Sequence, residues 1–168
     1  MLVDSLELIL FPSIMAFAAS SDLLTMTISN RVSIILVAGF FVLAVLSGMP
    51  PMIVLAHVGA ASLVLVVSFG LFTRGWIGGG DAKLAAATAL WLGFNLLLKY
   101  LLYASLFGGV LTVVLIEFRA LPLPGPFVAQ PWAQRLHRQG GAVPYGIALA
   151  AAGLAVYLDT PWMKSIGF

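Results

Sequence analysis

The sequence contains no cysteine and very little charge. Without a thiol, the chain can form no disulfide, no thiolate zinc site and no cysteine link to haem. Only 8% of its 168 residues are charged, whereas a soluble domain of this length carries roughly a quarter. With 62% hydrophobic residues and a mean hydropathy of +1.12, it would expose far too much apolar surface in water. The composition therefore predicts an integral membrane protein.

The first 22 residues also lack any basic side chain. A secretory signal begins with a positively charged region, whereas this segment carries Asp4 and Glu7. We therefore expect a retained first span. The net charge of +2 belongs to the loops on one membrane face, and it gives no indication of nucleic-acid binding.

Apolar segments account for most of the chain, and crossing a bilayer takes about 20 residues. As one helix, residues 82–118 would be about 55 Å long, much longer than a bilayer core of about 30 Å. This region must fold back near "GFNLLLKY". The expected spans are 5–21, 32–48, 52–72, 82–98, 100–118 and 143–158. The sequence thus predicts an all-α polytopic bundle of about six transmembrane helices, a single domain over 1–168 with no separate soluble domain.

The loops differ in basic charge. The segment between the fifth and sixth spans is rich in Pro and Gly, and "PWAQRLHRQ" within it suggests a short interfacial helix. The first, third and fifth loops carry six of the eight Lys and Arg residues: Arg31, Arg74, Lys83, Arg119, Arg135 and Arg138. Only Lys99 and Lys164 lie on the opposite face. The positive-inside rule then predicts cytoplasmic odd-numbered loops and two periplasmic termini.

Two aspartates fall at the same membrane boundary in this topology. Asp22 closes the first span and Asp81 opens the fourth, so both lie at the cytoplasmic face. Asp81 could simply cap its helix, and Asp22 could be solvated or pair with Arg31. However, carboxylates at membrane depth are costly and usually mark function.

A facing pair of carboxyl groups would have a specific chemistry. Like charges that close cannot both ionise easily, so one group keeps its proton while the other remains a base. Such a pair can hydrolyse a peptide bond without a metal. Three glycines, Gly78, Gly79 and Gly80, precede Asp81 and would let a substrate backbone approach it closely. A flexible turn between two spans is the plainer interpretation of these glycines.

Three stretches together resemble one family. "GGGDAKL" fits the Gly-x-Gly-Asp pattern of intramembrane aspartyl proteases. "ASSDLLTMTISNRVS" and "GGGDAKLAAATALWLG" resemble the two aspartate regions of type IV prepilin peptidases, and "GAVPYGIALAAAGL" is similar to their last span. In the first region, Ile28-Ser29-Asn30 replaces the family's Ile-Pro-Asn, so a rigid turn residue is lost.

The resemblance implies Asp22 and Asp81 as the catalytic pair. It implies cleavage of a prepilin leader, after a glycine, at the cytoplasmic face of the bacterial inner membrane. Longer members carry a cysteine-rich zinc domain that this chain lacks, so it resembles the short TadV/CpaA branch for Flp-type pilins, and N-methylation is not expected. No cofactor and no metal are implied. The expected partners are prepilins and pseudopilins, membrane lipid and the pilus or tad assembly machinery.

Other polar residues have both a supporting and a structural interpretation. The supporting or substrate-binding candidates are Gly78, Gly80, Lys83, Asn30 and Tyr145. Lys83 could instead be a membrane anchor, and Tyr145 an interfacial aromatic residue. His57 lies inside the third span and is expected to be a bonded packing residue. Asp4, Glu7 and Asp159 are expected to be solvated on the outer face.

Two other functions fit the same aspartates. A small ion-coupled transporter would use them as coupling groups, although such proteins usually place these charges near the midplane. A non-catalytic partner in pilus or secretion assembly would not need them for chemistry.

Overall fold

The computed structural model describes residues 2–164, and the side chains of residues 5–163. This part of the chain forms eight helices and no strand. The helices are α1 (Leu2–Thr25), α2 (Asn30–Leu46), α3 (Pro51–Thr73), α4 (Gly79–Ala120), α5 (Gly125–Val128), α6 (Pro131–His137), α7 (Tyr145–Tyr157) and α8 (Pro161–Lys164).

The long helices have the length and composition of membrane spans. Among the described residues, α1 (from Ser5), α3 and α4 are long and apolar enough to cross a bilayer, and α2 and α7 are shorter apolar helices. Large apolar side chains cover the outside of the bundle; Val45 and Leu98, for example, are each 80% exposed. Such a surface is stable in lipid and not in water. The prediction of an all-α membrane protein is confirmed.

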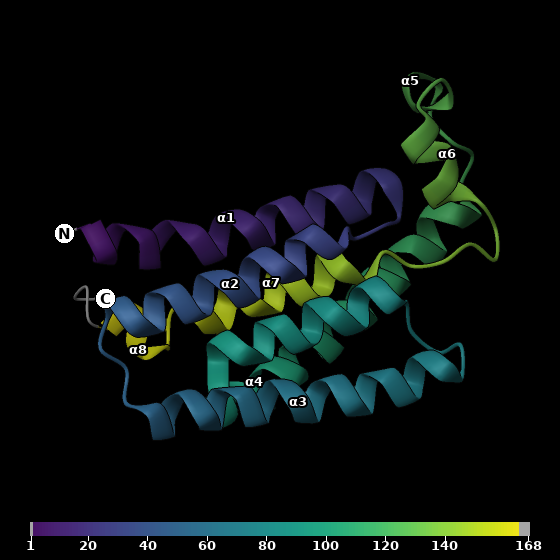
Figure 1. Ribbon diagram of the computed structural model, residues 1–168. Helices are drawn as coiled ribbons and strands as arrows, with labels where there is room; N and C mark the ends of the chain where they lie inside the picture. The colour runs from purple at the N-terminus through teal and green to yellow at the C-terminus, as the bar shows by residue number, and fades with distance from the viewer. Residues whose placement is uncertain (1, 165–168) are drawn as a thin grey trace.

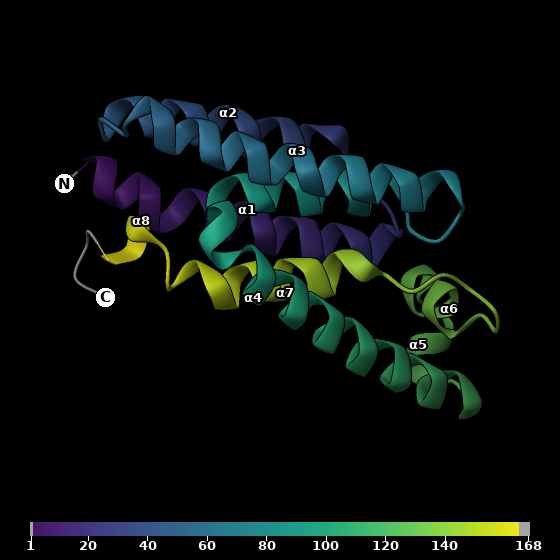
Figure 2. The ribbon, with the colours of Figure 1, turned by 90° about the horizontal axis from the view of Figure 1, so that it is seen from below.

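Helix α4 contains a sharp break at Gly93. This residue has φ 65° and ψ −178°, a conformation that glycine adopts at little cost and other residues rarely adopt. Figures 1 and 2 both show the chain reversing there, so that α4 consists of two antiparallel halves. The predicted fold-back is confirmed: the turn comes at Gly93, the first residue of the predicted stretch "GFNLLLKY", so the fourth span ends before the expected residue 98. With this division, the six expected spans correspond to α1, α2, α3, the two halves of α4 and α7.

Side chains from other helices satisfy the carbonyl groups that the break leaves open. A helix end lacks intrahelical partners for its last carbonyls. The ring Nδ1 of His57 bonds the Leu90 carbonyl oxygen at 2.7 Å, and the indole N–H of Trp162 donates to the Trp91 carbonyl oxygen at 3.2 Å. His57 is therefore a bonded packing residue, as expected, and it fixes where α4 turns back.

Both described ends of the chain lie at one end of the bundle. The start of α1, helix α8 and the α2–α3 connection are at this end, while the α1–α2 turn, the α3–α4 loop, α5 and α6 lie at the other (Figures 1 and 2). Because the chain crosses the bundle an even number of times, its two described ends lie on the same side. The opposite end therefore brings together the turns that follow α1 and α3.

Two arginines hold the basic loop between α4 and α7 in place through hydrogen bonds to backbone carbonyl oxygens. The predicted short helix within residues 131–139 is present as α6. Arg119 donates to the carbonyl oxygens of Leu136, Gly141 and Ala142, and Arg135 donates to that of Leu24. These bonds fix the loop against the end of α1 and so shape the entrance to α7.

The expectation of three solvated outer carboxylates is wrong for Glu7. Its side chain is 4% exposed, and its carbonyl oxygen accepts a 2.7 Å bond from the hydroxyl of Tyr157. Hydropathy could not reveal this because α7 covers that face of α1. Asp159 is half-exposed and pairs with Lys99 at 2.6 Å. The side chains of Asp4 and Lys164 lie outside the described residues.

Candidate active site

Asp22 lies in the last turn of α1, facing the interior of the bundle. Its side chain is only 5% exposed. The N–H of Met26 closes the turn by donating to the Asp22 carbonyl oxygen at 2.8 Å, and Met26 then takes a positive φ of 56°. The helix ends there, and the chain turns toward α2 directly beside the carboxyl group.

Ser29 stands where the Ile-Pro-Asn motif of the prepilin peptidases has its proline, and the backbone there has a conformation that proline can adopt. Ser29 has φ −64° and ψ 141°, and a proline ring would impose nearly the same φ. Its hydroxyl accepts a 3.3 Å bond from the N–H of Arg31 and caps α2. Serine therefore stabilises the same turn in a different way, by capping α2, because serine is among the best N-cap residues.

The loop before Asp81 starts with a glycine at the end of α3. Gly75 has φ +74°, its N–H donates to the Phe72 carbonyl oxygen, and the N–H of Trp76 reaches back to Leu71. This pair of bonds is a Schellman termination, in which glycine supplies the left-handed residue. It fixes the course of the four residues that lead to α4.

Asp81 occupies the third position of α4, after the N-cap residue Gly78. Its carboxyl group hydrogen-bonds the backbone of Gly78, and a Cβ on Gly78 would lie 2.8 Å from Oδ2. A carboxylate at this position that reaches back to the N-cap is a known capping arrangement. Asp81 therefore does cap its helix, and the cap also fixes the direction of the carboxyl group.

Gly79 and Gly80 are in contact with the protein's own chain. A Cβ on Gly80 would lie 3.1 Å from Cβ and 3.4 Å from the carbonyl oxygen of Ile28, and one on Gly79 would lie 3.3 Å from the Phe72 ring. The space that we expected a substrate backbone to use at Gly80 is thus filled by the turn that follows Asp22. The glycine lets the two aspartate-bearing segments pack together, while Gly78 stays exposed.

Gly146, at the start of α7, is a site residue that the sequence alone did not identify. Its N–H donates a 2.7 Å hydrogen bond to Oδ2 of Asp22. A Cβ on Gly146 would lie 2.7 Å from the same oxygen and 2.6 Å from Cδ1 of Ile28. The Pro-Tyr-Gly motif contains this glycine, but hydropathy and motif spacing do not show that its N–H faces Asp22.

The two carboxyl groups line one cleft at this end of the bundle. The cleft has a volume of about 790 Å³. Its lining comes from α1, the α3–α4 loop, the start of α4, the loop before α7 and α7 itself: Asp22, Met26, Gly75, Trp76, Ile77, Gly78, Asp81, Ala85, Gly141, Ala142, Val143, Tyr145 and Leu149. The charges of Asp22 and Asp81 interact. Two groups 59 positions apart in the sequence thus share one water-accessible space.

Tyr145 lies at the edge of the cleft. Its ring packs on the second half of α4, where a Cβ on Gly108 would lie 2.5 Å from Cε1, and its hydroxyl is 3.4 Å from that of Thr112. The side chain is 41% exposed. It connects α7 with α4 and forms part of the cleft wall.

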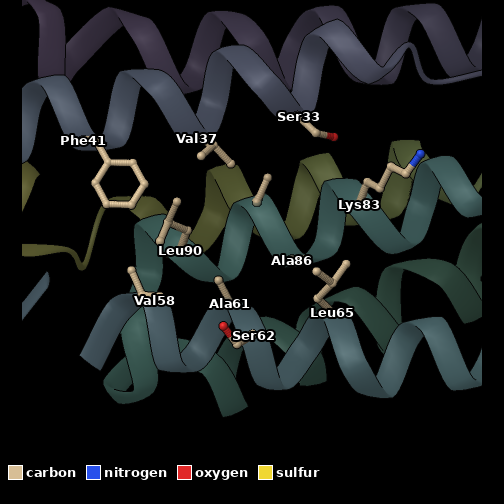
Figure 3. A pocket seen from close by; sticks show the side chains of 11 residues that line it. Ser33, Val37, Phe41, Val58, Ala61, Ser62, Leu65, Lys83, Ala86 and Leu90 are labelled. Atoms are coloured by element: carbon tan, nitrogen blue, oxygen red, sulfur yellow. The ribbon is translucent and has the colours of Figure 1, made fainter. Parts of the chain in front are cut away.

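Lys83 and Asn30 form a bond with each other and do not line the cleft. The Lys83 ammonium group donates to Oδ1 of Asn30 at 2.9 Å. Residues two apart on a helix point about 200° from each other, so Lys83 leaves the opposite side of α4 from Asp81. Figure 3 shows Lys83 in a separate groove between α2, α3 and α4. Its bond connects the turn after Asp22 with the first turn of α4.

Among the described residues, no three His, Asp or Glu side chains gather closely enough to hold a metal ion. The polar chemistry of the cleft is that of two carboxyl groups and the backbone N–H groups that orient them.

Comparison with known proteins identifies the family of the chain. Neither the curated proteins nor the solved structures gave a match to the chain. The family model described as the type IV leader peptidase family matches residues 9–113, which is more than half of the chain and includes both Asp22 and Asp81. The chain therefore belongs to the type IV leader peptidase family, a family of aspartic-type peptidases that act on prepilins.

Proposed function

We propose that this protein is a prepilin leader peptidase in which Asp22 and Asp81 form the catalytic pair. The observation that carries the proposal is their position in one cleft, each with its carboxyl group oriented by a backbone contact. Family membership supports the peptidase chemistry. The chain acts as one membrane domain, and no metal takes part.

The proposed reaction is the hydrolysis of one amide bond. The ionised carboxylate takes a proton from a water molecule while the water oxygen attacks the scissile carbonyl carbon. The protonated carboxyl group donates its proton to the carbonyl oxygen, giving a neutral tetrahedral intermediate. When this intermediate collapses, the C–N bond breaks, and the carboxyl group that took the water proton gives it to the leaving amine. The other carboxylate takes a proton from a hydroxyl group of the intermediate, so the carboxylic acid product forms and each aspartate returns to its initial protonation state.

The cleft suits an extended peptide with a small residue at the bond. Its volume of about 790 Å³ is large enough for several residues of extended chain, and Gly75 and Gly78 leave part of its wall without side chains. A glycine just before the cut, which the family resemblance implies, would let the carbonyl group approach both carboxyl groups.

The active site is proposed to face the cytoplasm of the inner membrane, with both termini in the periplasm. Six of the eight Lys and Arg residues lie in or next to the turns at the cleft end: Arg31, Arg74, Lys83, Arg119, Arg135 and Arg138. Basic loops remain on the cytoplasmic side during insertion. A prepilin leader in the cytoplasm could then reach the cleft directly.

We further assign the chain to the short TadV/CpaA branch that processes Flp-type pilins. The absence of cysteine is incompatible with the zinc-binding insertion of the longer prepilin peptidases. We therefore expect no N-methyltransferase activity, and we expect the pilus or tad assembly machinery to use the processed pilin.

The test is co-expression with a Flp-type prepilin from the same genome, read as a gel shift of the pilin. Asn keeps the shape of Asp and removes the titratable proton. Asp22→Asn and Asp81→Asn should abolish the shift, whereas Asp159→Asn, the same change at the Lys99 ion pair outside the cleft, should leave it intact. Cleavage that persists in either catalytic variant would overturn the proposal.

A further inference from the structure

Tyr100, in the second half of α4, is a buried residue with an unused hydroxyl group. Its side chain is fully buried, and its hydroxyl has no hydrogen-bond partner among the described residues. The hydroxyl of Thr88 faces it, but Thr88 donates its own proton to the Leu84 carbonyl oxygen at 2.8 Å. The two hydroxyl groups do not form a hydrogen bond of normal geometry. The O–H of Tyr100 is therefore not used by any bond within the described part of the chain.

An unpaired hydroxyl in the interior lowers the stability of the fold. Burying it without a partner costs free energy, whereas an apolar ring of the same shape carries no such penalty. Phenylalanine differs from tyrosine only in lacking this hydroxyl and would fill the same space. Buried unpaired polar groups are rare in native proteins, and a role in catalysis is one reason for which they are retained. The surroundings of Tyr100 therefore decide what its hydroxyl can do.

These surroundings lead to the cleft. Ala85 and Thr88 follow Asp81 by four and seven positions, so the three residues lie on one face of the first half of α4. Tyr100 belongs to the same cluster of packed, buried side chains as Ala85. Ala85 in turn lines the cleft together with Asp81. Tyr100 therefore lies behind the part of the cleft wall that Asp81 and Ala85 form.

The carboxyl group of Asp81 is the charge that acts on the Tyr100 hydroxyl. The other buried members of the cluster come from α3, α4 and α7 and are all apolar. Tyr103 packs at the edge of the cluster, and its ring faces the ammonium group of Lys99. In an interior of low dielectric, a free hydroxyl turns its positive end toward a nearby negative charge. For Tyr100, that charge is the ionised form of Asp81.

We infer that Tyr100 is a positioning residue for Asp81, and that its hydroxyl dipole stabilises the ionised carboxylate from behind the cleft wall. The inference rests on the proposed function, in which one carboxyl group of the pair is ionised while the other keeps its proton. Stabilising a carboxylate beside a second carboxyl group helps to maintain this division. The hydroxyl of Tyr100 thus lowers the stability of the fold and supports the chemistry of the site.

Tyr157 provides a matched control. Its side chain is 1% exposed, and its hydroxyl donates a 2.7 Å bond to the Glu7 carbonyl oxygen near the opposite end of the bundle. Tyr157→Phe removes this bond and should lower the Tm in detergent by roughly 2–4 °C. Tyr100→Phe removes no hydrogen bond of the described structure, so its Tm should equal or exceed that of the wild type. The two changes are chemically identical and should have opposite consequences for stability and function.

The pH profile of prepilin cleavage tests the inference in the active protein. Asp22 and Tyr145 are the titratable side chains that line the cleft besides Asp81, and both remain in place in the two variants. Because the aspartates titrate as a pair, Tyr100→Phe should move at least one limb of the profile to higher pH, by about half a unit or more. Tyr157→Phe should keep the profile of the wild type. A Tyr100→Phe profile that coincides with that of Tyr157→Phe would overturn the inference.

A titration of the carboxyl groups gives a readout that does not depend on cleavage. The chain contains four aspartates, so carbon-13 labelling of their carboxyl groups gives few NMR signals, and Asp81→Asn identifies the signal of Asp81. In Tyr100→Phe, the midpoint of this signal should lie at higher pH than in Tyr157→Phe. If it does but the wild type does not cleave prepilin, the peptidase proposal fails and the assignment of Tyr100 stands. If the wild type cleaves and the midpoints are equal, the peptidase proposal stands and the assignment of Tyr100 fails.

Discussion

The N–H of Gly146 donates a 2.7 Å hydrogen bond to Oδ2 of Asp22, across 124 positions of the sequence. Gly146 lies in the first turn of α7, where N–H groups have no partner within the helix. Asp22 ends one helix, where the dipole disfavours a carboxylate, but it accepts from the start of another, where the dipole favours it. The position of α7 thus explains how a carboxyl group can be buried at that point.

We expect Gly146→Ala to lower prepilin cleavage by roughly a hundredfold, because a misplacement near 1 Å can cost that much. The added Cβ would lie 2.7 Å from Oδ2 of Asp22 and 2.6 Å from Cδ1 of Ile28, so the carboxyl group must move. The measurement is the initial rate of the pilin gel shift at equal enzyme levels.

Gly109→Ala is the matched control for this change. Gly109 lies in the second half of α4, and a Cβ there meets nothing within 4 Å. Its cleavage rate should equal that of the wild type. If Gly146→Ala cleaved as fast as Gly109→Ala, the hydrogen bond to Asp22 would have no part in positioning the carboxyl group.

The bond between Lys83 and Asn30 is expected to position the two aspartate segments. Lys83→Ala and Asn30→Ala should each lower cleavage by roughly two- to fivefold, since a hydrogen bond of this kind contributes about 0.5–1 kcal/mol. The double variant should be no slower than the slower single variant, as in a double-mutant cycle of interacting residues. If Lys83 instead contacted the substrate, Lys83→Ala would be much slower than Asn30→Ala, and the two effects would add.

Gly93 should be intolerant of any side chain. Gly93→Ala forces a residue with a Cβ into φ 65° and ψ −178°, a region essentially restricted to glycine, at a cost of about 1–3 kcal/mol, and its Cβ would lie 2.8 Å from Nε2 of His57. Displacing His57 would also leave the Leu90 carbonyl oxygen without its partner. We expect the Tm in detergent to fall by roughly 5 °C or more, with Gly109→Ala unchanged. An unaltered Tm would mean that the two halves of α4 can repack around the break.

The membrane spans could be predicted from the sequence because hydropathy and span length are local quantities. The fold-back of α4 followed from a comparison of about 55 Å with a bilayer core of about 30 Å. Its location at Gly93 did not follow, because it depends on His57 and Trp162, which come from α3 and α8. A helix break of this kind is fixed by tertiary partners for its open carbonyl groups.

The sequence predicted the two aspartates of the site, but it predicted only some of the contacts that position them. The topology placed Asp22 and Asp81 at one face, and the structure adds the cleft that both of them line. The packing of Gly80 on Ile28 and the bond of Gly146 to Asp22 could not be derived. Both depend on how closely helices distant in sequence approach, and hydropathy carries no information on that distance.

The turn after Asp22 should tolerate a proline in place of Ser29, as in the Ile-Pro-Asn motif of the prepilin peptidases. Ser29→Pro keeps φ near −64° and should gain about 0.4–1 kcal/mol from a less flexible unfolded chain. It loses the cap to the Arg31 N–H, which costs typically about 1 kcal/mol. The two effects nearly cancel, so we expect a Tm close to that of the wild type and undiminished cleavage. Ser29→Ala, which removes the cap and gains nothing, should be the less stable of the two variants. A Ser29→Pro protein with clearly lower Tm than Ser29→Ala would contradict this expectation and show that the turn needs a backbone geometry or an N–H group that proline does not provide.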